Sequence, residues 1–230
     1  MNLEQSEVVA CDTRWMLDGP ATAELSAERR LVDGVVAVAG VALLAVTWSL
    51  ASRSAIPAWE VEVFRFFNDW PDWLQGPTWP IMQAGAVVAV PVVAAVGWLL
   101  WRRQQPTAAV MLGGLGAWAL AKVVKVLLER GRPAEYLADV NLRPAWDGLG
   151  FVSGHVATVF AIAVVVAPYL RRPWKIVLWA LAGATGLLRM YTAAHLPLDV
   201  IGGAGLGMAL GALANLTCRV WRPPRDRGAS

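Results

Sequence analysis

The two histidines of the chain, His155 and His195, are the residues whose types and spacing best suit chemistry. His155 closes the segment Ser153-Gly154-His155, and His195 lies between Arg189 and Asp199. Histidine exchanges protons near neutral pH and can also act as a nucleophile. The four-residue spacing from His195 to Asp199 puts both on one face of a helix, so Asp199 can accept a hydrogen bond from one imidazole nitrogen. We interpret His195, His155 and Asp199 as candidate catalytic residues.

A second group of candidate residues is basic and consists of Lys125, Arg132 followed by Pro133, and Arg189. A basic side chain at the end of an apolar segment costs about 2.5–3.5 kcal/mol to insert, so it needs a partner or a purpose. A bound phosphate would supply the missing negative charge, and the guanidinium fork matches phosphate oxygens. Ser153 is expected to cap a helix whose free N–H groups form an anion site, and Gly154 allows a close approach of the backbone. The predicted phosphate-binding residues are Lys125, Arg132, Ser153, Gly154 and Arg189.

These polar residues also allow other interpretations. The two histidines with Asp199 could bind zinc, but three nearby cations would repel a divalent ion and no His-Glu-x-x-His pattern is present. We therefore expect no metal and no cofactor. Lys122 and Arg130 fit the snorkelling of basic side chains at a membrane interface as well as they fit phosphate binding. The run 113–116 is rich in glycine but lacks the Lys-Ser/Thr ending of a nucleotide-binding loop.

The composition indicates a membrane protein with several spans. Of the 230 residues, 57% are hydrophobic and only 16% are charged. The formal net charge is +3, and no basic arm suggests a nucleic acid partner. Residues 1–30 are polar and mixed in charge and lack the pattern of a cleavable signal, which predicts a flexible or locally helical cytoplasmic tail. Cys11 and Cys218 are far apart and both fall on the predicted inner side, so no structural disulfide is expected.

Six apolar segments are candidates for transmembrane helices, since a span needs about 20 mostly apolar residues. They are Gly34 to Ala51, Trp79 to Trp101, Thr107 to Leu128, His155 to Leu170, Trp174 to Leu188, and Leu196 to Thr217. The segment from Pro57 to Pro80 mixes aromatic residues with charged ones such as Glu60, which is typical of an amphipathic helix in the membrane interface. The predicted fold is an all-α integral membrane bundle of six transmembrane helices with one interfacial helix. The predicted domain covers residues 31–220, between cytoplasmic tails at 1–30 and 221–230.

The basic residues between the predicted spans orient this bundle. Clusters at 29–30, 102–103, 171–175 and 219–227 all fall on one side, which the positive-inside rule makes cytoplasmic, together with both termini. The three polar motifs then meet on the opposite, outer face, although the orientation argument did not use them. Gly203, Gly207 and Gly211 repeat every four residues in the last span, which predicts close helix packing inside the bundle.

In their order and spacing these residues resemble the type 2 phosphatidic acid phosphatase (PAP2) superfamily, whose signatures are Lys-x6-Arg-Pro, Pro-Ser-Gly-His and Ser-Arg-x5-His-x3-Asp. The matching residues are Lys125, Arg132 and Pro133; Ser153, Gly154 and His155; and Arg189, His195 and Asp199. With the six-span layout, the resemblance extends over roughly residues 31–220. Val152 replaces the usual proline, and Leu188 replaces the usual serine, which removes one possible hydrogen bond to phosphate.

The resemblance implies a PAP2-like core and a metal-independent phosphatase mechanism. His195 would attack phosphorus and form a phosphohistidine, Asp199 would orient it, and His155 would protonate the departing oxygen and then activate water. Lys125, Arg132, Ser153, Gly154 and Arg189 would hold the phosphoryl oxygens.

The implied substrate is a lipid phosphate at the outer face of a bacterial cytoplasmic membrane. Candidates are a polyprenyl phosphate or diphosphate, such as undecaprenyl diphosphate of the cell envelope, and a phosphatidyl-type lipid. Two alternatives stay open: transfer of the phosphoryl group to an acceptor other than water, and a non-catalytic membrane protein that binds lipids or anions. The expected partners are the lipid phosphate and membrane lipids, while the identity of the lipid and the oligomeric state are not specified by the sequence.

Overall fold

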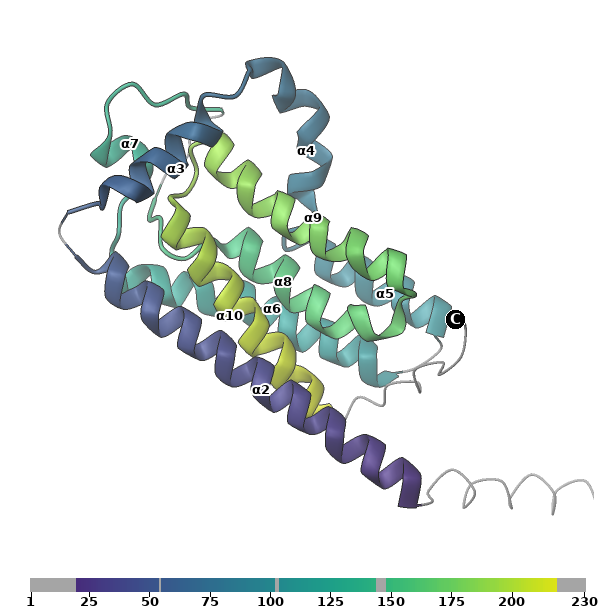
Figure 1. Cartoon of the computed structure of the whole chain (residues 1–230). Coiled ribbons are helices and arrows are strands. Elements are labelled where there is room, and N and C mark those ends of the chain that lie inside the picture. The colour runs from purple at the N-terminus through teal and green to yellow at the C-terminus, as the bar shows by residue number, and fades with distance from the viewer. Residues whose placement is uncertain (1–19, 54, 102–103, 144–147, 219–230) are drawn as a thin grey trace, which may run out of the picture.

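The computed structural model describes residues 20–53, 55–101, 104–143 and 148–218, and this part of the chain is helical without strands. The long helices are α2 (Pro20–Ala51), α5 (Ala89–Trp101), α6 (Gln104–Leu128), α8 (Gly154–Val166), α9 (Arg172–Tyr191) and α10 (Pro197–Thr217). The short ones are α3 (Ala58–Asn68), α4 (Gln75–Gln83), α7 (Pro133–Tyr136) and the 3-10 turns η2 (Asp72–Leu74) and η3 (Ala167–Tyr169). The long helices lie side by side, and α3, α4 and α7 lie at one end of the bundle, called here the cap end (Figure 1). The predicted all-α class is confirmed.

Helix α10 is the centre of the bundle and packs against α2, α6 and α8. Its glycines permit this closeness, because a Cβ at Gly203 would lie 2.6 Å from the carbonyl oxygen of Ser153 and one at Gly211 would lie 2.7 Å from that of Ala161. A Cβ at Gly207 would meet the carbonyl oxygen of Ala157. The prediction that this glycine repeat serves close helix packing inside the bundle is confirmed.

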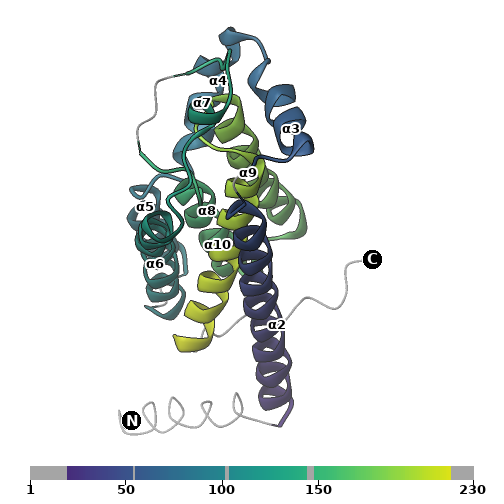
Figure 2. The ribbon, with the colours of Figure 1, turned by 90° about the vertical axis from the view of Figure 1, so that its left-hand side faces the viewer.

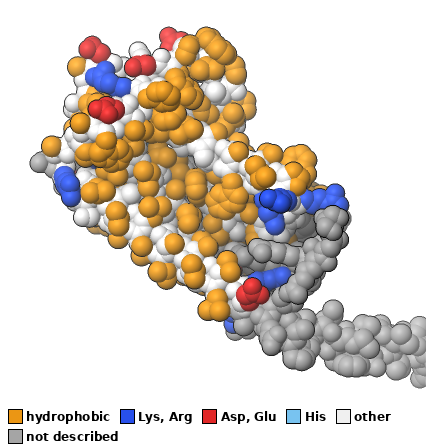
Figure 3. Space-filling view, viewed as in Figure 1, with side chains coloured by type: hydrophobic (Ala, Val, Ile, Leu, Met, Phe, Trp, Pro, Cys, Tyr) orange, Lys and Arg blue, Asp and Glu red, His pale blue; other side chains and the backbone are white. Residues whose placement is uncertain are grey.

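Three helical stretches are long and apolar enough to span a membrane: Glu28–Ala51, Gln104–Tyr136 and Pro197–Thr217. Two further apolar stretches, Ala89–Leu100 and Gly154–Tyr169, are shorter. Length and composition therefore support a membrane protein but do not confirm the predicted count of six spans. On the face seen in Figure 3, hydrophobic side chains form a broad band, and charged side chains gather toward its two ends. Such a band suits a protein that contacts lipid along its sides.

The helix bounds differ from the predicted spans in two places. The expected span from Trp79 to Trp101 is divided, since α4 ends at Gln83 and α5 begins at Ala89. Gly85 lies in this break against the backbone of His155, where a Cβ would be 2.8 Å from the carbonyl carbon. The break therefore lies directly against the first turn of α8. Helix α2 begins at Pro20 and runs unbroken through residue 30, the expected end of the amino-terminal tail.

The ends of the long helices sort into two groups. The start of α2, the end of α5, the start of α6, the end of α10 and the α8–α9 connection lie at the end opposite α3, α4 and α7 (Figure 2). The basic residues Arg171, Arg172 and Lys175 belong to this opposite end. The end of α6 and the starts of α8 and α10 lie toward the cap end. The predicted tail 221–230 and Cys11 fall outside the described residues, and Cys218 carries a free thiol.

Candidate active site

A tight turn between α9 and α10 presents His195. After α9 ends at Tyr191, Ala193 adopts a left-handed backbone conformation with φ of 55°. The chain then folds back, and the N–H groups of Ala194 and His195 donate to the carbonyl oxygen of Arg189 at 3.0 and 3.2 Å. The His195 side chain is only 2% exposed. The backbone thus fixes the imidazole directly before the first turn of α10.

Asp199 lies beside this imidazole, as the spacing predicts, but does not hydrogen-bond to it. Nδ1 of His195 is 3.6 Å from Oδ2 of Asp199, which is longer than a hydrogen bond. Nδ1 has no hydrogen-bond partner among the described residues. The same Oδ2 accepts the N–H of Leu196 at 2.9 Å, which holds the carboxylate at the start of α10. Catalytic hydrogen bonds in unliganded sites are often long and shorten when a ligand binds.

Two of the predicted phosphate ligands, Lys125 and Arg132, donate hydrogen bonds to backbone carbonyls of the loops around His195. Lys125, at the end of α6, donates from Nζ to the carbonyl oxygens of Leu149 at 2.6 Å and Gly150 at 2.8 Å. Arg132 donates from Nε to the carbonyl of Gly148 at 2.8 Å and from Nη1 to that of Ala194 at 2.7 Å. An ammonium has three donors, so Lys125 retains one beyond these two bonds.

Ser153 stands at the N-cap position of α8, with Gly154 and His155 following in the first turn. The predicted capping hydrogen bond is not formed: the Ser153 hydroxyl makes no cap bond and has no partner among the described residues. Its backbone N–H donates instead to the carbonyl of Asp199 at 2.9 Å. A Cβ at Gly154 would meet only the Ala121 methyl at 3.8 Å, so protein packing does not require glycine there. The hydroxyl and the first-turn N–H groups are thus left for another group.

The charges around His195 decide its protonation state. His195 lies in the turn between α9 and α10, and its burial lowers the pKa of the imidazole well below the ordinary value. The positive charges of Lys125, Arg189 and Arg132, and then His155, lower that pKa further. These residues come from all three sequence motifs, and each lies close enough to act on His195. At neutral pH the imidazole is therefore uncharged and has a lone pair on one nitrogen.

Two residues of this region make contacts that the sequence did not predict. Arg130 was expected either to snorkel or to bind phosphate, but it is only 6% exposed and donates to Oδ1 of Asp199 at 2.8 Å. Glu60 was placed among the charges of the interfacial segment, but it is fully buried and receives Arg130 Nη2 at 2.7 Å. The inward face of α3 carries Glu60, Phe64 and Asn68. Exposed Trp59 and Phe66 make its other face apolar as well, so periodicity alone could not identify the inward side.

Lys122 differs from Arg130 in its surroundings. It is exposed on α6, and its Nζ lies 3.7 Å from the ring centroid of Trp118. An aromatic face of this kind stabilises a cation at the edge of an apolar surface. The snorkelling interpretation therefore suits Lys122 better than the phosphate-binding one.

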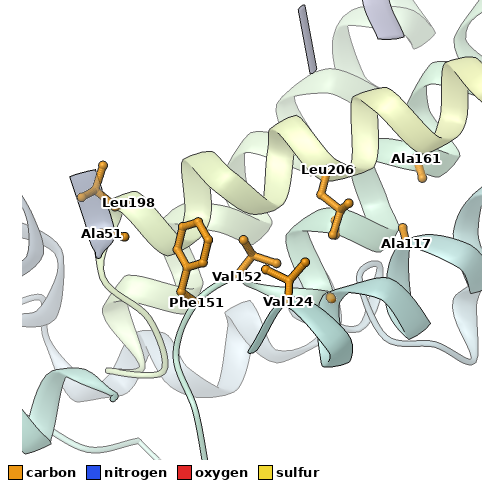
Figure 4. Packing of buried hydrophobic residues seen from close by; sticks show 10 residues of the cluster. Ala51, Ala117, Val124, Phe151, Val152, Ala161, Leu198 and Leu206 are labelled. Carbon is orange, nitrogen blue, oxygen red and sulfur yellow. The ribbon is translucent and has the colours of Figure 1, made fainter. Parts of the chain in front are cut away.

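The two departures from the family signatures lie in apolar packing. Val152 is fully buried and belongs with Phe151, Val124, Leu198 and Leu206 to the core where α6, α8 and α10 meet (Figure 4). Leu188 is 5% exposed and packs with Met82 and Tyr191. Both side chains are part of hydrophobic clusters that support the turns carrying Ser153 and His195.

The arrangement can bind an anion and offers an uncharged imidazole as a nucleophile, with a second histidine nearby. Among the residues that the structure describes, no cluster of three His, Cys, Asp or Glu side chains is placed to hold a metal ion.

Comparisons with known proteins agree on one family. A family model described as the PAP2 superfamily matches residues 106–222. The crystal structure of Aquifex aeolicus LpxE is similar, with 28% identity, a TM-score of 0.62, and coverage of 69% of this chain and 95% of that chain. A transmembrane PAP2 type phosphatidylglycerolphosphate phosphatase from Bacillus subtilis is 22% identical, with a TM-score of 0.64 and coverage of 78% and 95%. No curated protein sequence matches the chain.

Proposed function

Because the chain belongs to the PAP2 superfamily and is a phosphatase of the PAP2 type, we propose that it is a metal-independent lipid phosphatase acting through a phosphohistidine. The observation that carries the proposal is the grouping of the buried His195 with three cations and His155 at one end of an apolar bundle. Cations that surround a neutral imidazole suit a phosphate ester, whose negative charge they would neutralise.

The first chemical step is the transfer of the phosphoryl group to His195. The Nε2 lone pair of His195 attacks phosphorus opposite the leaving oxygen, so that an N–P bond forms as the P–O bond to the lipid breaks. His155 gives its proton to the departing oxygen. Asp199, 3.6 Å from Nδ1, stabilises the positive charge that develops on the His195 ring. The lipid then leaves as an alcohol, or as a monophosphate if the substrate is a diphosphate.

The second step releases phosphate. His155, now uncharged, takes a proton from a water molecule, whose oxygen attacks phosphorus while the N–P bond to His195 breaks. Inorganic phosphate leaves and both histidines return to their initial states. Lys125, Arg132, Arg189, the Ser153 hydroxyl and the N–H of Gly154 would hold the phosphoryl oxygens in both steps.

The proposed substrate class rests on the position of the site. The site is at the cap end, and Arg171, Arg172 and Lys175 lie at the opposite end, which the positive-inside rule assigns to the cytoplasm. We therefore place the site at the outer face of a bacterial cytoplasmic membrane, with six spans over residues 31–220 and both tails inside. Polyprenyl phosphates and diphosphates, including undecaprenyl diphosphate, and phosphatidyl-type phosphates are the substrates that fit this position.

Rapid chemical quenching tests the covalent intermediate directly. Protein in detergent is mixed with a ³²P-labelled polyprenyl diphosphate and denatured in alkali, in which phosphohistidine survives. The expected result is one labelled peptide containing His195, absent from His195→Ala. Phosphate release without labelled protein would point to direct attack by water, and transfer of label to an added alcohol would point to a phosphotransferase.

A panel of lipid phosphates then tests the substrate class. The panel contains polyprenyl monophosphate, polyprenyl diphosphate, phosphatidate and phosphatidylglycerol phosphate, each compared by kcat/KM. The proposal predicts release from at least one of them. If every lipid binds and none releases phosphate, the chain is an anion-binding protein and the proposed activity is wrong.

A further inference from the structure

A buried ionic network lies behind Asp199, on the side that does not face His195. Its members are Glu60 of α3, Arg130 after α6 and Asp199 of α10, which are fully buried except for the 6% exposure of Arg130. Arg130 binds Glu60 through both guanidinium Nη atoms, at 3.1 and 2.7 Å, and binds Asp199 through Nη1 at 2.8 Å. Three elements that are distant in sequence thus meet at one guanidinium.

The network fixes the Asp199 carboxylate from two directions. Oδ1 receives Arg130, and Oδ2 receives the N–H of Leu196 at 2.9 Å. Glu60 in turn receives the N–H of Leu198 at 3.0 Å, which ties α3 to the first turn of α10. With both oxygens occupied, the carboxylate can turn little, and Oδ2 stays on the Nδ1 side of His195.

The burial of these three charges is costly, and their mutual contacts must offset that cost. Charged side chains leave water at a high cost, which is offset only where opposite charges and hydrogen bonds meet them in good geometry. In the proposed mechanism Glu60 and Arg130 touch neither the phosphate nor the reacting nitrogen. Outer partners of this kind orient a functional side chain, and their loss commonly lowers activity while the ligand-binding groups remain.

We propose that Glu60 and Arg130 are positioning residues that hold Asp199, and through it the His195 imidazole, in line for attack on phosphorus. Through Glu60, helix α3 contacts the residues that hold Asp199. The sequence predicted this helix as an interfacial segment. The inference rests on the phosphatase function proposed above, because it assigns a role within that same reaction.

Glu60→Gln is the most direct variant, since the amide keeps the size of the side chain and can still accept the N–H of Leu198. Its matched control is Glu62→Gln, which removes an exposed carboxylate two residues away on the same helix. Phosphate release from a lipid phosphate gives kcat and KM, inorganic phosphate as a competitive inhibitor reports the binding pocket, and a thermal midpoint reports folding. We expect kcat to fall about 10-fold or more for Glu60→Gln, with KM and the phosphate inhibition constant within about threefold of wild type.

Arg130 supplies a second, independent measurement if Glu60→Gln does not fold. Arg130→Lys keeps one charge and should recover part of the kcat that Arg130→Gln loses, while exposed Arg53→Gln serves as its control. Because both residues act through Asp199, the loss in Glu60→Gln/Arg130→Gln should be smaller than the product of the two single losses.

The outcomes separate the inference from the function on which it rests. An unchanged kcat in Glu60→Gln and Arg130→Gln overturns the inference while the function stands. Parallel worsening of kcat, phosphate inhibition and thermal midpoint also overturns it, because the network would then be structural only. No phosphate release by the wild-type protein from any lipid would instead reject the proposed function.

Discussion

At the scale of single residues, the protonation of His195 is the feature on which the chemistry depends. An imidazole in water is about half protonated near pH 6.5, and its protonated form has no lone pair for attack. Burial lowers the pKa of His195, and Lys125, Arg189 and Arg132 lower it further. The same cations that would bind phosphate thus keep the nucleophile uncharged before the phosphate arrives.

This coupling predicts how activity depends on pH. Because the pKa of His195 is lowered, the fall of kcat/KM on the acid side should begin below about pH 6.5, after allowance for the substrate phosphate, which itself titrates near pH 6. Lys125→Met removes the cation with the largest electrostatic effect on His195, so the pKa of His195 should rise. The acid limb, which is the fall of kcat/KM at low pH, should then move to higher pH while overall activity decreases. The matched control, Lys122→Met, changes an exposed lysine on the same helix and should not change the pH at which kcat/KM falls. An acid limb that stays fixed in Lys125→Met would refute the coupling.

The sequence identified the residues around His195 better than it identified their contacts. Short motifs with fixed spacing place Lys125, His155 and Asp199 at helix ends, and the helix ends meet in space. Spacing carries no information on rotamers. It therefore predicted a capping hydrogen bond from Ser153 and a hydrogen bond between His195 and Asp199, and neither forms, since Nδ1 and Oδ2 are 3.6 Å apart. Glu60 was missed because its contacts with Arg130 and Leu198 are tertiary and leave no local pattern.

At the scale of helices, the contact between α8 and α10 holds the two histidines relative to each other. Gly203, Gly207 and Gly211 let α10 approach the α8 backbone at Ser153, Ala157 and Ala161. His155 begins α8 and His195 immediately precedes α10. Any widening of this contact would separate His195, the proposed nucleophile, from His155, the proposed proton donor.

Gly207→Ala tests this contact, because its Cβ would collide with the carbonyl of Ala157 and lie 2.8 Å from Cβ of Phe160. Overpacking of this kind costs about 1–3 kcal/mol, and for a chain of this size each kcal/mol lowers the thermal midpoint by roughly 2–4 °C. Gly183→Ala on α9 adds the same methyl where no atom lies within 4 Å and should leave the midpoint unchanged or slightly raised. Equal midpoints for the two variants, measured in one detergent, would show that the α8–α10 contact tolerates separation.

The limits of prediction are also visible in the helices. Apolar runs located α6, α9 and α10 to within a few residues, because hydrophobic length is a strong signal. The break at 84–88 was not foreseen, since nothing local to that apolar run marks the backbone of His155 against Gly85. Residues 1–30 were predicted to be flexible or locally helical, and the sequence did not locate the start of α2 at Pro20. A polar stretch has no apolar pattern that would mark where a helix begins.

At the scale of the whole molecule, the basic cluster at the start of α9 and the candidate site lie at opposite ends of the bundle. The basic residues Arg171, Arg172 and Lys175 are at one end, and the turn that carries His195 is at the cap end. The apolar band between them matches what lipid requires (Figure 3). In a membrane this polarity would place the histidines outside the cell and the basic residues inside.

Cysteine labelling in intact cells tests that orientation. In a background of Cys11→Ser and Cys218→Ser, Arg53→Cys places a thiol in the exposed connection after α2, and Arg172→Cys places one at the start of α9. A membrane-impermeant maleimide should label position 53 in intact cells and position 172 only after permeabilisation. The reverse pattern would put the candidate site in the cytoplasm and remove the argument for an envelope lipid.

The central claim is that His195 forms a bond to phosphorus without help from a metal. Phosphate release from a lipid phosphate, measured in detergent with excess EDTA for wild type and His195→Ala, tests it most directly. The account predicts full wild-type activity in EDTA and a loss of at least about 10³-fold in His195→Ala at an unchanged thermal midpoint. Wild-type rates in His195→Ala, or activity abolished by EDTA and restored by a divalent metal, would contradict it.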